Sequence, residues 1–218
     1  MILLIFGIHL WKASSLTNMK PQTHREIEKI ITVMLYILKR ISSDGVGYQY
    51  RLFKILYLAD KKALSSVGRP VCNEMYIKKE DGPSPSMAHD LLRRSRKPHE
   101  GRTFFDKEIG EIFEYNGWNT IRAKIEPVLN YLTPSDIGVI DRAIKEVKHK
   151  EEVAESRLAL PFLDEDASGE KIIPNHDIAW QNAEMNAPIS RRDMIIASGD
   201  LSMLSIFDEF EAFKTGLD

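Results

Sequence analysis

The sequence predicts a single, mainly helical α+β domain with about six helices and a small antiparallel sheet. Three observations support this class. Apolar residues recur at intervals of three and four over most of the chain, two apolar runs flank an Asn-Gly pair at 116–117, and Gly or Pro clusters separate the segments. We expect the folded domain to span 21–218, with 1–20 as an extension outside the fold.

Two helices are expected first. Thr23 and Glu26 have the spacing of a capping box, and Gly45 and Gly47 end the helical pattern. The apolar face of this helix is Ile27, Ile30, Ile31, Met34, Leu35, Leu38 and Ile41. A second helix is expected over 49–66, with Gly68 at its end. Its inward stripe is Leu52, Ile55, Leu56 and Ala59, with Asp60, Lys61 and Lys62 facing water.

A strand, a corner and a hairpin are expected next. Residues 72–79 predict a strand, and the Gly and Pro residues at 82–86 predict a tight corner. Ser84 as N-cap and Pro85 as first helical residue would begin a third helix. Its inward residues are Met87, Ala88, Leu91 and Leu92. The Asn-Gly link between 112–115 and 118–125 predicts a β-hairpin.

The second half of the chain predicts further helices. Thr133 and Asp136 cap a fourth helix, in which Pro134 takes the first position. Its inward residues are Ile137, Val139, Ile140, Ala143, Ile144 and Val147. Residues 151–175 combine a weak helical pattern with a loop, and short helices are expected near 176–186, after Ser190 and over 201–214.

Charge is divided unevenly along the chain, although the net charge is only −2. Residues 19–102 hold 17 Lys and Arg against 9 Asp and Glu, whereas residues 151–218 hold 5 against 15. Such a division is typical either of an acidic tail that folds back on a basic body or of two surfaces with different partners. Two solvated faces of different charge are the alternative.

The N-terminus and the cysteine content indicate the compartment. The apolar run at 1–11 is too short to span a bilayer and lacks a basic region before it, so we expect neither a membrane span nor a signal peptide. Met19 is a plausible natural start. A single cysteine, Cys72, excludes an intramolecular disulfide and favours a cytoplasmic location.

Catalytic and metal motifs are missing from the sequence. The six histidines lack metal-ligand spacing, and Gly45 and Gly47 lack the rest of a phosphate-binding loop. Asp164, Asp166 and Gly169 resemble the opening of a calcium loop, but Asn175 stands where a bidentate Glu is required. We therefore expect no enzyme activity, no cofactor and no metal.

A basic stretch leaves DNA as an alternative partner. Arg93, Arg94, Arg96 and Lys97 follow the third expected helix, where cations also favour the helix dipole. The order of helix, helix, strand, helix and hairpin is roughly that of a winged helix, a DNA-binding arrangement. His89 and Asp90 on the outer face of the third helix count against base reading.

Several stretches between 51 and 180 resemble one family when taken in order. They are Arg51 to Asp60 (RLFKILYLAD), Gly68 to Val71 (GRPV), Met75-Tyr76, Gly82 to Ser86 (GPSPS), Tyr131 to Ile144 and Asn175 to Trp180 (NHDIAW). Together they resemble the signature of the SocA-like antitoxins with a Panacea domain, including the phage-associated GepA-like group. The resemblance spans about 24–214, with departures at Asp81, at Ser84 and in the long acidic stretch 151–174.

The resemblance implies an antitoxin of a toxin–antitoxin or phage-associated module that binds its cognate toxin directly. It also implies an adaptor role towards an AAA+ protease. Because most signature positions maintain the fold, the partly exposed ones are the candidates for partner contact, namely Arg69, Tyr76, Pro83 and Pro85. The alternative is that Arg69 only caps the second helix and Tyr76 packs beneath the corner.

Overall fold

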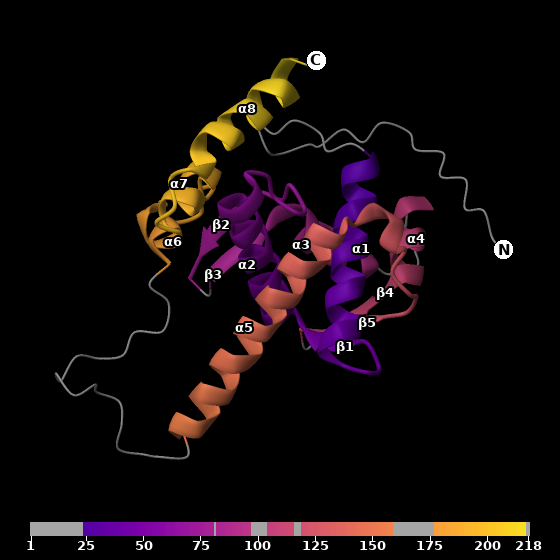
Figure 1. Ribbon diagram of the computed structural model, residues 1–218. Coiled ribbons are helices and arrows are strands. Elements are labelled where there is room, and N and C mark those ends of the chain that lie inside the picture. The colour runs from indigo at the N-terminus through magenta and orange to yellow at the C-terminus, as the bar shows by residue number, and fades with distance from the viewer. Residues whose placement is uncertain (1–23, 81, 97–103, 116–118, 159–176, 217–218) are drawn as a thin grey trace.

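The computed structural model describes residues 24–80, 82–96, 104–115, 119–158 and 177–216. These ranges hold eight α-helices, a short 3-10 helix and five strands in two small antiparallel sheets (Figure 1). The predicted class, mainly helical with a small antiparallel sheet, is therefore confirmed. The expected extension at 1–20, the cap at Thr23, the Asn-Gly pair and the calcium-like loop lie outside the described residues.

Three helices form the centre of the molecule: α1 (His24–Ile41), α2 (Gln49–Val67) and α5 (Pro134–Leu158). Helix α2 packs against both others. Its predicted stripe is fully buried, because Leu52, Ile55, Leu56 and Ala59 are each 0% exposed. Each large aliphatic side chain buried in this way contributes about 1.5–3 kcal/mol to folding. The prediction that Asp60 faces water is wrong. Its side chain is 1% exposed and accepts a hydrogen bond from the backbone N–H of Cys72, 12 residues further along the chain.

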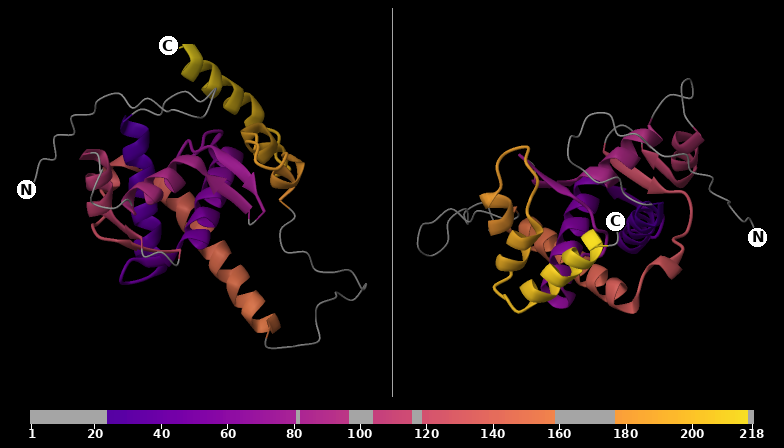
Figure 2. Two further views of the ribbon diagram at one scale, coloured as in Figure 1. Left: turned by 180° about the vertical axis from the view of Figure 1, so that it is seen from behind. Right: turned by 90° about the horizontal axis from the view of Figure 1, so that it is seen from above.

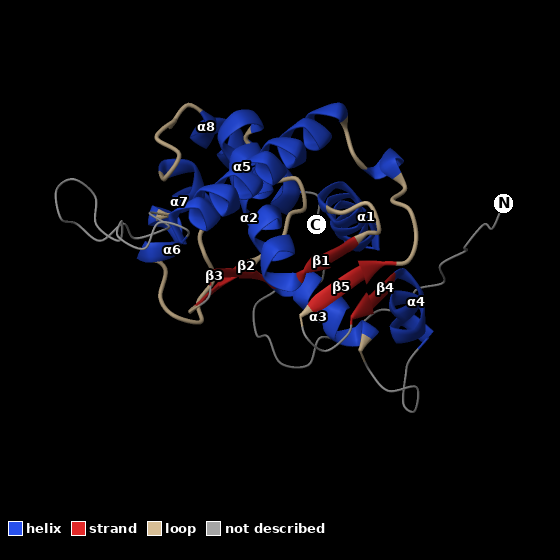
Figure 3. Cartoon of the chain, turned by 90° about the horizontal axis from the view of Figure 1, so that it is seen from below, coloured by secondary structure: helices blue, strands red, loops and turns tan. Residues whose placement is uncertain are grey.

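The three-stranded sheet contains β1 (Val46–Tyr48), β4 (Phe113–Tyr115) and β5 (Thr120–Ala123) in the order β1-β5-β4. The pairing of β4 with β5 confirms the predicted hairpin. Strand β1 was not predicted, since its glycine suggested a helix stop. A Cβ atom at Gly47 would lie 2.7 Å from Ile41 Cδ1, so glycine lets the strand approach α1. Helix α4 (Phe104–Ile112), beside this sheet in Figure 3, was also not predicted.

The two-stranded sheet pairs β2 (Tyr76–Lys79) with β3 (Gly82–Pro85). The predicted strand over 72–79 is thus correct only in its second half, and the predicted corner at 82–86 is wrong. Prolines fit this edge strand because its outer side needs no ladder donors. Helix α3 (Ser86–Ser95) begins after Pro85, so Ser84 is not its N-cap.

The start of α5 and the C-terminal helices follow the sequence closely. Thr133 Oγ1 accepts from the Asp136 N–H at 3.1 Å, and Asp136 Oδ2 accepts from the Thr133 N–H at 3.1 Å, which confirms the capping box. Ser190 caps α7 by accepting from the Asp193 N–H at 3.3 Å. The predicted short helices are α6 (Ile178–Asn182), α7 (Arg191–Ile196) and α8 (Met203–Gly216), and η1 (Leu129–Tyr131) precedes α5.

The C-terminal helices and the three-stranded sheet lie at opposite sides of the central helices. Figure 2 shows α6, α7 and α8 on one side and α4 with the sheet on the other, in both views. Among the described segments, none of the helices combines the length and apolar character needed to cross a bilayer. Because the C-terminal helices and the three-stranded sheet lie at opposite sides, they form two separate surfaces that a partner could contact.

Candidate partner-binding surface

The connection between α2 and β2 begins at Gly68, which ends α2 in a left-handed conformation with φ of 70°. The Gly68 N–H donates to the Leu64 carbonyl oxygen at 3.2 Å. A Cβ atom at this position would lie 2.4 Å from Ile206 Cγ2 of α8. Glycine is therefore needed twice, for the backbone conformation and for the close packing of α8 on the end of α2.

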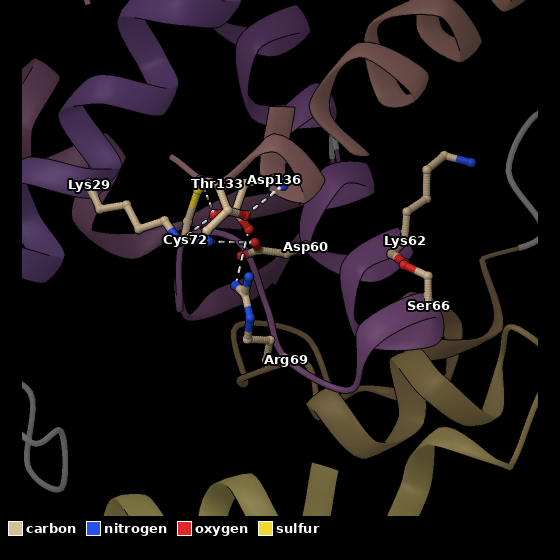
Figure 4. Close-up of polar contacts among 8 residues, drawn as sticks. All are labelled: Lys29, Asp60, Lys62, Ser66, Arg69, Cys72, Thr133 and Asp136. Carbon is tan, nitrogen blue, oxygen red and sulfur yellow. Dashed lines mark hydrogen bonds and ion pairs between the residues drawn. The ribbon is translucent and has the colours of Figure 1, made fainter. Parts of the chain in front are cut away.

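Arg69 is tied to the start of α5 through a buried carboxylate (Figure 4). Its Nη1 donates to Asp136 Oδ1 at 3.0 Å, while Lys29 Nζ donates to Asp136 Oδ2 at 3.0 Å. Burial acts to raise the pKa of Asp136, but the Thr133 N–H and the two cations outweigh it and hold the pKa below its usual value. About a third of the Arg69 side chain remains exposed.

Tyr76 belongs to a second buried cluster, centred on Asp60. Asp60 Oδ1 accepts from the Cys72 N–H at 2.8 Å, and Asp60 Oδ2 accepts from the Tyr76 hydroxyl at 3.0 Å. Burial raises the pKa of Asp60, because its direct partners are neutral. The ring of Tyr76 packs edge-on against Tyr57, with centroids 5.1 Å apart. Asp60 therefore fixes the course of the chain from 72 to 76.

A third carboxylate, Glu74, occupies the N-terminus of α3. It accepts from the N–H groups of Met87 at 2.8 Å and Ala88 at 3.0 Å, so it caps the helix that Ser84 was expected to cap. Burial, with a smaller contribution from Asp60, raises the pKa of Glu74 to about 7 against the opposing effect of these donors. No sequence signal marks a cap 12 residues before its helix.

The four predicted contact residues fall into two groups. Tyr76 pairs with Pro85 across the β2–β3 ladder, and Pro83 lies two residues before Pro85 on the same strand. Arg69 is instead held against α5. Tyr76 is 2% exposed, so its expected exposure is wrong, and it packs beneath the hairpin as the alternative stated. Pro85 is buried as well, whereas Pro83 is half-buried. A role of these residues in partner binding stays a prediction.

Exposed apolar side chains lie beside the connection that carries Arg69 and continue along α8. Val67 at the end of α2 is 36% exposed, and Ile206, which packs on Gly68, is 44% exposed. Phe213 is 68% exposed and lies two helical turns beyond Ile206 on the same face of α8. We call Val67, Arg69, Ile206 and Phe213 the Arg69 surface. Sequence reasoning missed it, because α8 is more than 130 residues from Arg69 in the chain.

Cys72 does not supply a nucleophile. The thiol is buried, and burial raises its pKa well above the usual value, with Asp60 and Glu74 acting in the same direction. A thiol held in its neutral form is a poor nucleophile at neutral pH. The described residues thus form a set of buried polar clusters beneath an exposed apolar and cationic surface.

Comparison with known proteins finds one family. Residues 52–157, just under half of the chain, match the family model described as "Antitoxin SocA-like, Panacea domain". This segment, from the inner stripe of α2 to the end of α5, is therefore similar to the SocA-like Panacea domain. No curated protein and no solved structure matches the chain.

Proposed function

We propose that this chain is an antitoxin that neutralises a cognate toxin by direct protein binding in the cytoplasm, with no catalytic step of its own. The observation that carries the proposal is the match of residues 52–157 to the Panacea domain, whose family supports an antitoxin-type role. The clusters at Asp60, Glu74 and Asp136 agree with it, since these buried carboxylates of the domain hold the fold together and are not left free for chemistry. Exposed groups are then left to bind the partner.

The Arg69 surface is the part of the molecule that we assign to the toxin. Arginine and aromatic side chains dominate binding energy at protein interfaces, often by about 2 kcal/mol or more each. Arg69 is held in place by Asp136, so little side-chain entropy is lost when a partner binds its exposed part. Asp208, which pairs with Arg192 at 2.6 Å, and Glu209 follow Ile206 on α8 and are both exposed. The surface therefore fits an apolar patch that also offers a hydrogen-bond acceptor to the exposed part of Arg69.

The predicted contact residues on the β2–β3 hairpin, Tyr76, Pro83 and Pro85, have a smaller role in this proposal. Pro83 offers part of its ring to a partner, while Tyr76 and Pro85 hold the hairpin from beneath. An adaptor role, in which the antitoxin delivers its bound toxin to an AAA+ protease, is a further element of the proposal. It predicts that the toxin is degraded faster in cells that contain the antitoxin and the protease.

A growth assay tests the proposal. Each open reading frame found next to the gene is expressed alone and together with this chain, and we expect one of them to stop growth only when expressed alone. Arg69→Ala and Phe213→Ala should each reduce neutralisation while the melting temperature is kept. Val128→Ala is the matched control, because Val128 is 55% exposed on another element. Full neutralisation by Arg69→Ala and Phe213→Ala together would exclude the Arg69 surface, and neighbours that are all harmless would contradict the antitoxin role.

A further inference from the structure

The three-stranded sheet and helices α1, α2 and α3 have a connectivity that points to a second function, beyond the antitoxin role. In chain order α1, β1, α2, α3, β4 and β5 give helix, strand, helix, helix and hairpin, and the first strand pairs with the last in the order β1-β5-β4. This is the connectivity of a winged helix, with β2–β3 inserted before α3 and α4 inserted after it. In that arrangement the third helix faces the DNA and the hairpin lies beside it.

The outer face of α3 is exposed and carries two arginines beside a histidine. His89, Arg93 and Arg96 follow each other at intervals of four and three residues, so they form one stripe, and all three are exposed. Burial and the neighbouring Arg93 lower the pKa of His89, so the positive charge of the stripe comes from the two arginines. Helix α4 packs against a different face of α3, where Arg94 donates to Asp106 at 3.1 Å. The insertion of α4 therefore leaves the stripe accessible.

Aromatic side chains join this stripe to the hairpin and to α2. The Arg96 guanidinium lies 4.7 Å from the ring centroid of Tyr115 on β4. The Tyr115 hydroxyl donates to Gln49 at the start of α2, next to Tyr50, which is 53% exposed. His89 packs edge-on against Phe53, with centroids 6.0 Å apart. We call His89, Arg93, Arg96, Tyr50 and Tyr115 the α3 surface, and Figure 3 shows α3 beside the three-stranded sheet.

Negative groups within this region are already paired. Asp90 accepts from Arg93 at 2.9 Å and from Arg94 at 2.7 Å. Arg94 is mostly buried, so it can keep its pairing with Asp90 when the exposed Arg93 contacts a phosphate. Glu114 on the hairpin pairs with Arg122 at 3.8 Å. Helix α8, which carries Asp208, Glu209 and Glu211, lies away from the three-stranded sheet (Figure 2). A polyanion can therefore approach α3 without meeting them.

We propose that the α3 surface binds duplex DNA, with Arg93 and Arg96 contacting neighbouring backbone phosphates on one side of the groove that receives α3. An exposed arginine that is stacked on an aromatic ring is held ready for a phosphate and loses little freedom on binding. The connectivity and the aromatic–arginine stack favour DNA over an acidic protein surface. The proposal concerns a different surface from the one assigned to the toxin, so each can fail alone.

Fluorescence anisotropy with the full chain and a labelled mixed-sequence duplex of about two helical turns tests this inference. We expect binding that weakens steeply between about 50 and about 200 mM salt. The double variant Arg93→Ala, Arg96→Ala should bind about tenfold or more weakly and should reduce the salt slope by about two. Arg192→Ala is the matched control, because Arg192 is half-exposed on α7 and lies with the acidic helices.

Three outcomes would overturn the proposal. They are no binding at the lowest salt concentration, equal binding by the double variant at an unchanged melting temperature, and competition by polyaspartate as effective as competition by unlabelled duplex. The last outcome would assign the α3 surface to an acidic protein partner. If the double variant loses its fold, the single variants and a charge-reducing Arg93→Gln, Arg96→Gln pair repeat the measurement.

Discussion

Asp60 and Asp136 are both buried, at 1% and 2% exposed, yet their surroundings shift their pKa values in opposite directions. Asp60 accepts from a backbone N–H and a tyrosine hydroxyl, which cannot offset the cost of burying a charge. Asp136 accepts from Lys29, Arg69 and the Thr133 N–H. The comparison shows that burial raises the pKa of both carboxylates, and that a backbone donor together with two cationic partners reverses the direction at Asp136.

The two carboxylates also differ in what they connect. Asp60 acts within one stretch of chain, from α2 to the following strand, whereas Asp136 joins α1, the end of α2 and the start of α5. Asp60 therefore determines the course of the chain after α2, whereas Asp136 holds three helices together. Four experiments, on Asp60, Glu74, Asp136 and Lys29, test how the partners of a buried carboxylate determine its contribution to stability.

Removal of the Asp60 carboxylate should have the largest effect. Asp60→Ala leaves the Cys72 N–H and the Tyr76 hydroxyl buried without their acceptor and opens a small cavity. We expect a loss of about 4 kcal/mol in the free energy of unfolding, measured by urea denaturation. Asp60→Asn is the control, because its amide oxygen can still accept the Cys72 N–H, and it should retain most of the stability. Equal losses in the two variants would contradict this account.

Glu74 should give the clearest pH dependence. Its pKa rises from 4.5 to about 7 in the folded protein, so its contribution to stability is full below the unfolded value and is lost as pH rises towards 7. Over that range the stability of the wild type relative to Glu74→Gln should fall by up to about 3 kcal/mol. Urea denaturation of both proteins at several pH values measures the difference. A difference that is constant with pH would show that folding does not raise the pKa of Glu74.

Asp136→Asn should reduce the free energy of unfolding by less than the Asp60 and Glu74 variants do. Its effect should depend on pH in the opposite sense from that of Glu74. The amide keeps an acceptor for the Thr133 N–H but loses the charge that pairs with Lys29 and Arg69, so we expect a loss of about 2 kcal/mol at neutral pH. Because the folded pKa of Asp136 is lowered, this loss should shrink as pH falls through that value. A penalty that grows in acid would invert the proposed roles of the two carboxylates.

Lys29→Met should reduce the free energy of unfolding by the smallest amount of the four variants. Arg69 remains to pair with Asp136, and Lys29 is partly exposed, so we expect a loss of about 1 kcal/mol or less. Lys39→Met is the matched control, since Lys39 pairs with the exposed carboxylate of Glu126 and should cost even less. If Lys29→Met costs as much as Asp136→Asn, then Arg69 does not share the charge of Asp136.

Periodicity and capping were enough to locate most helices. Leu52, Ile55 and Leu56 define their buried stripe by spacing alone, and Thr133 and Asp136 form the reciprocal cap that their separation predicts. The Asn-Gly link likewise predicted the pairing of β4 with β5. These features depend on residues within one or two turns of each other. The backbone geometry of a helix or hairpin therefore determines them without reference to the rest of the chain.

Tertiary structure alone decided what the polar residues do. Asp60 comes directly after the apolar stripe of α2, where helical spacing predicts an exposed side chain. It is buried only because the chain from Cys72 to Tyr76 packs over it and donates hydrogen bonds to its carboxylate. Glu74 caps a helix that begins 12 residues later, and Ile206 meets Gly68 across more than half of the chain. Such contacts bring together residues far apart in sequence, and a hydrogen bond between them leaves no periodic trace in either segment. The division of the surface into an apolar region at Arg69 and a cationic region at α3 was decided at the same level, by the packing of helices that local spacing does not orient.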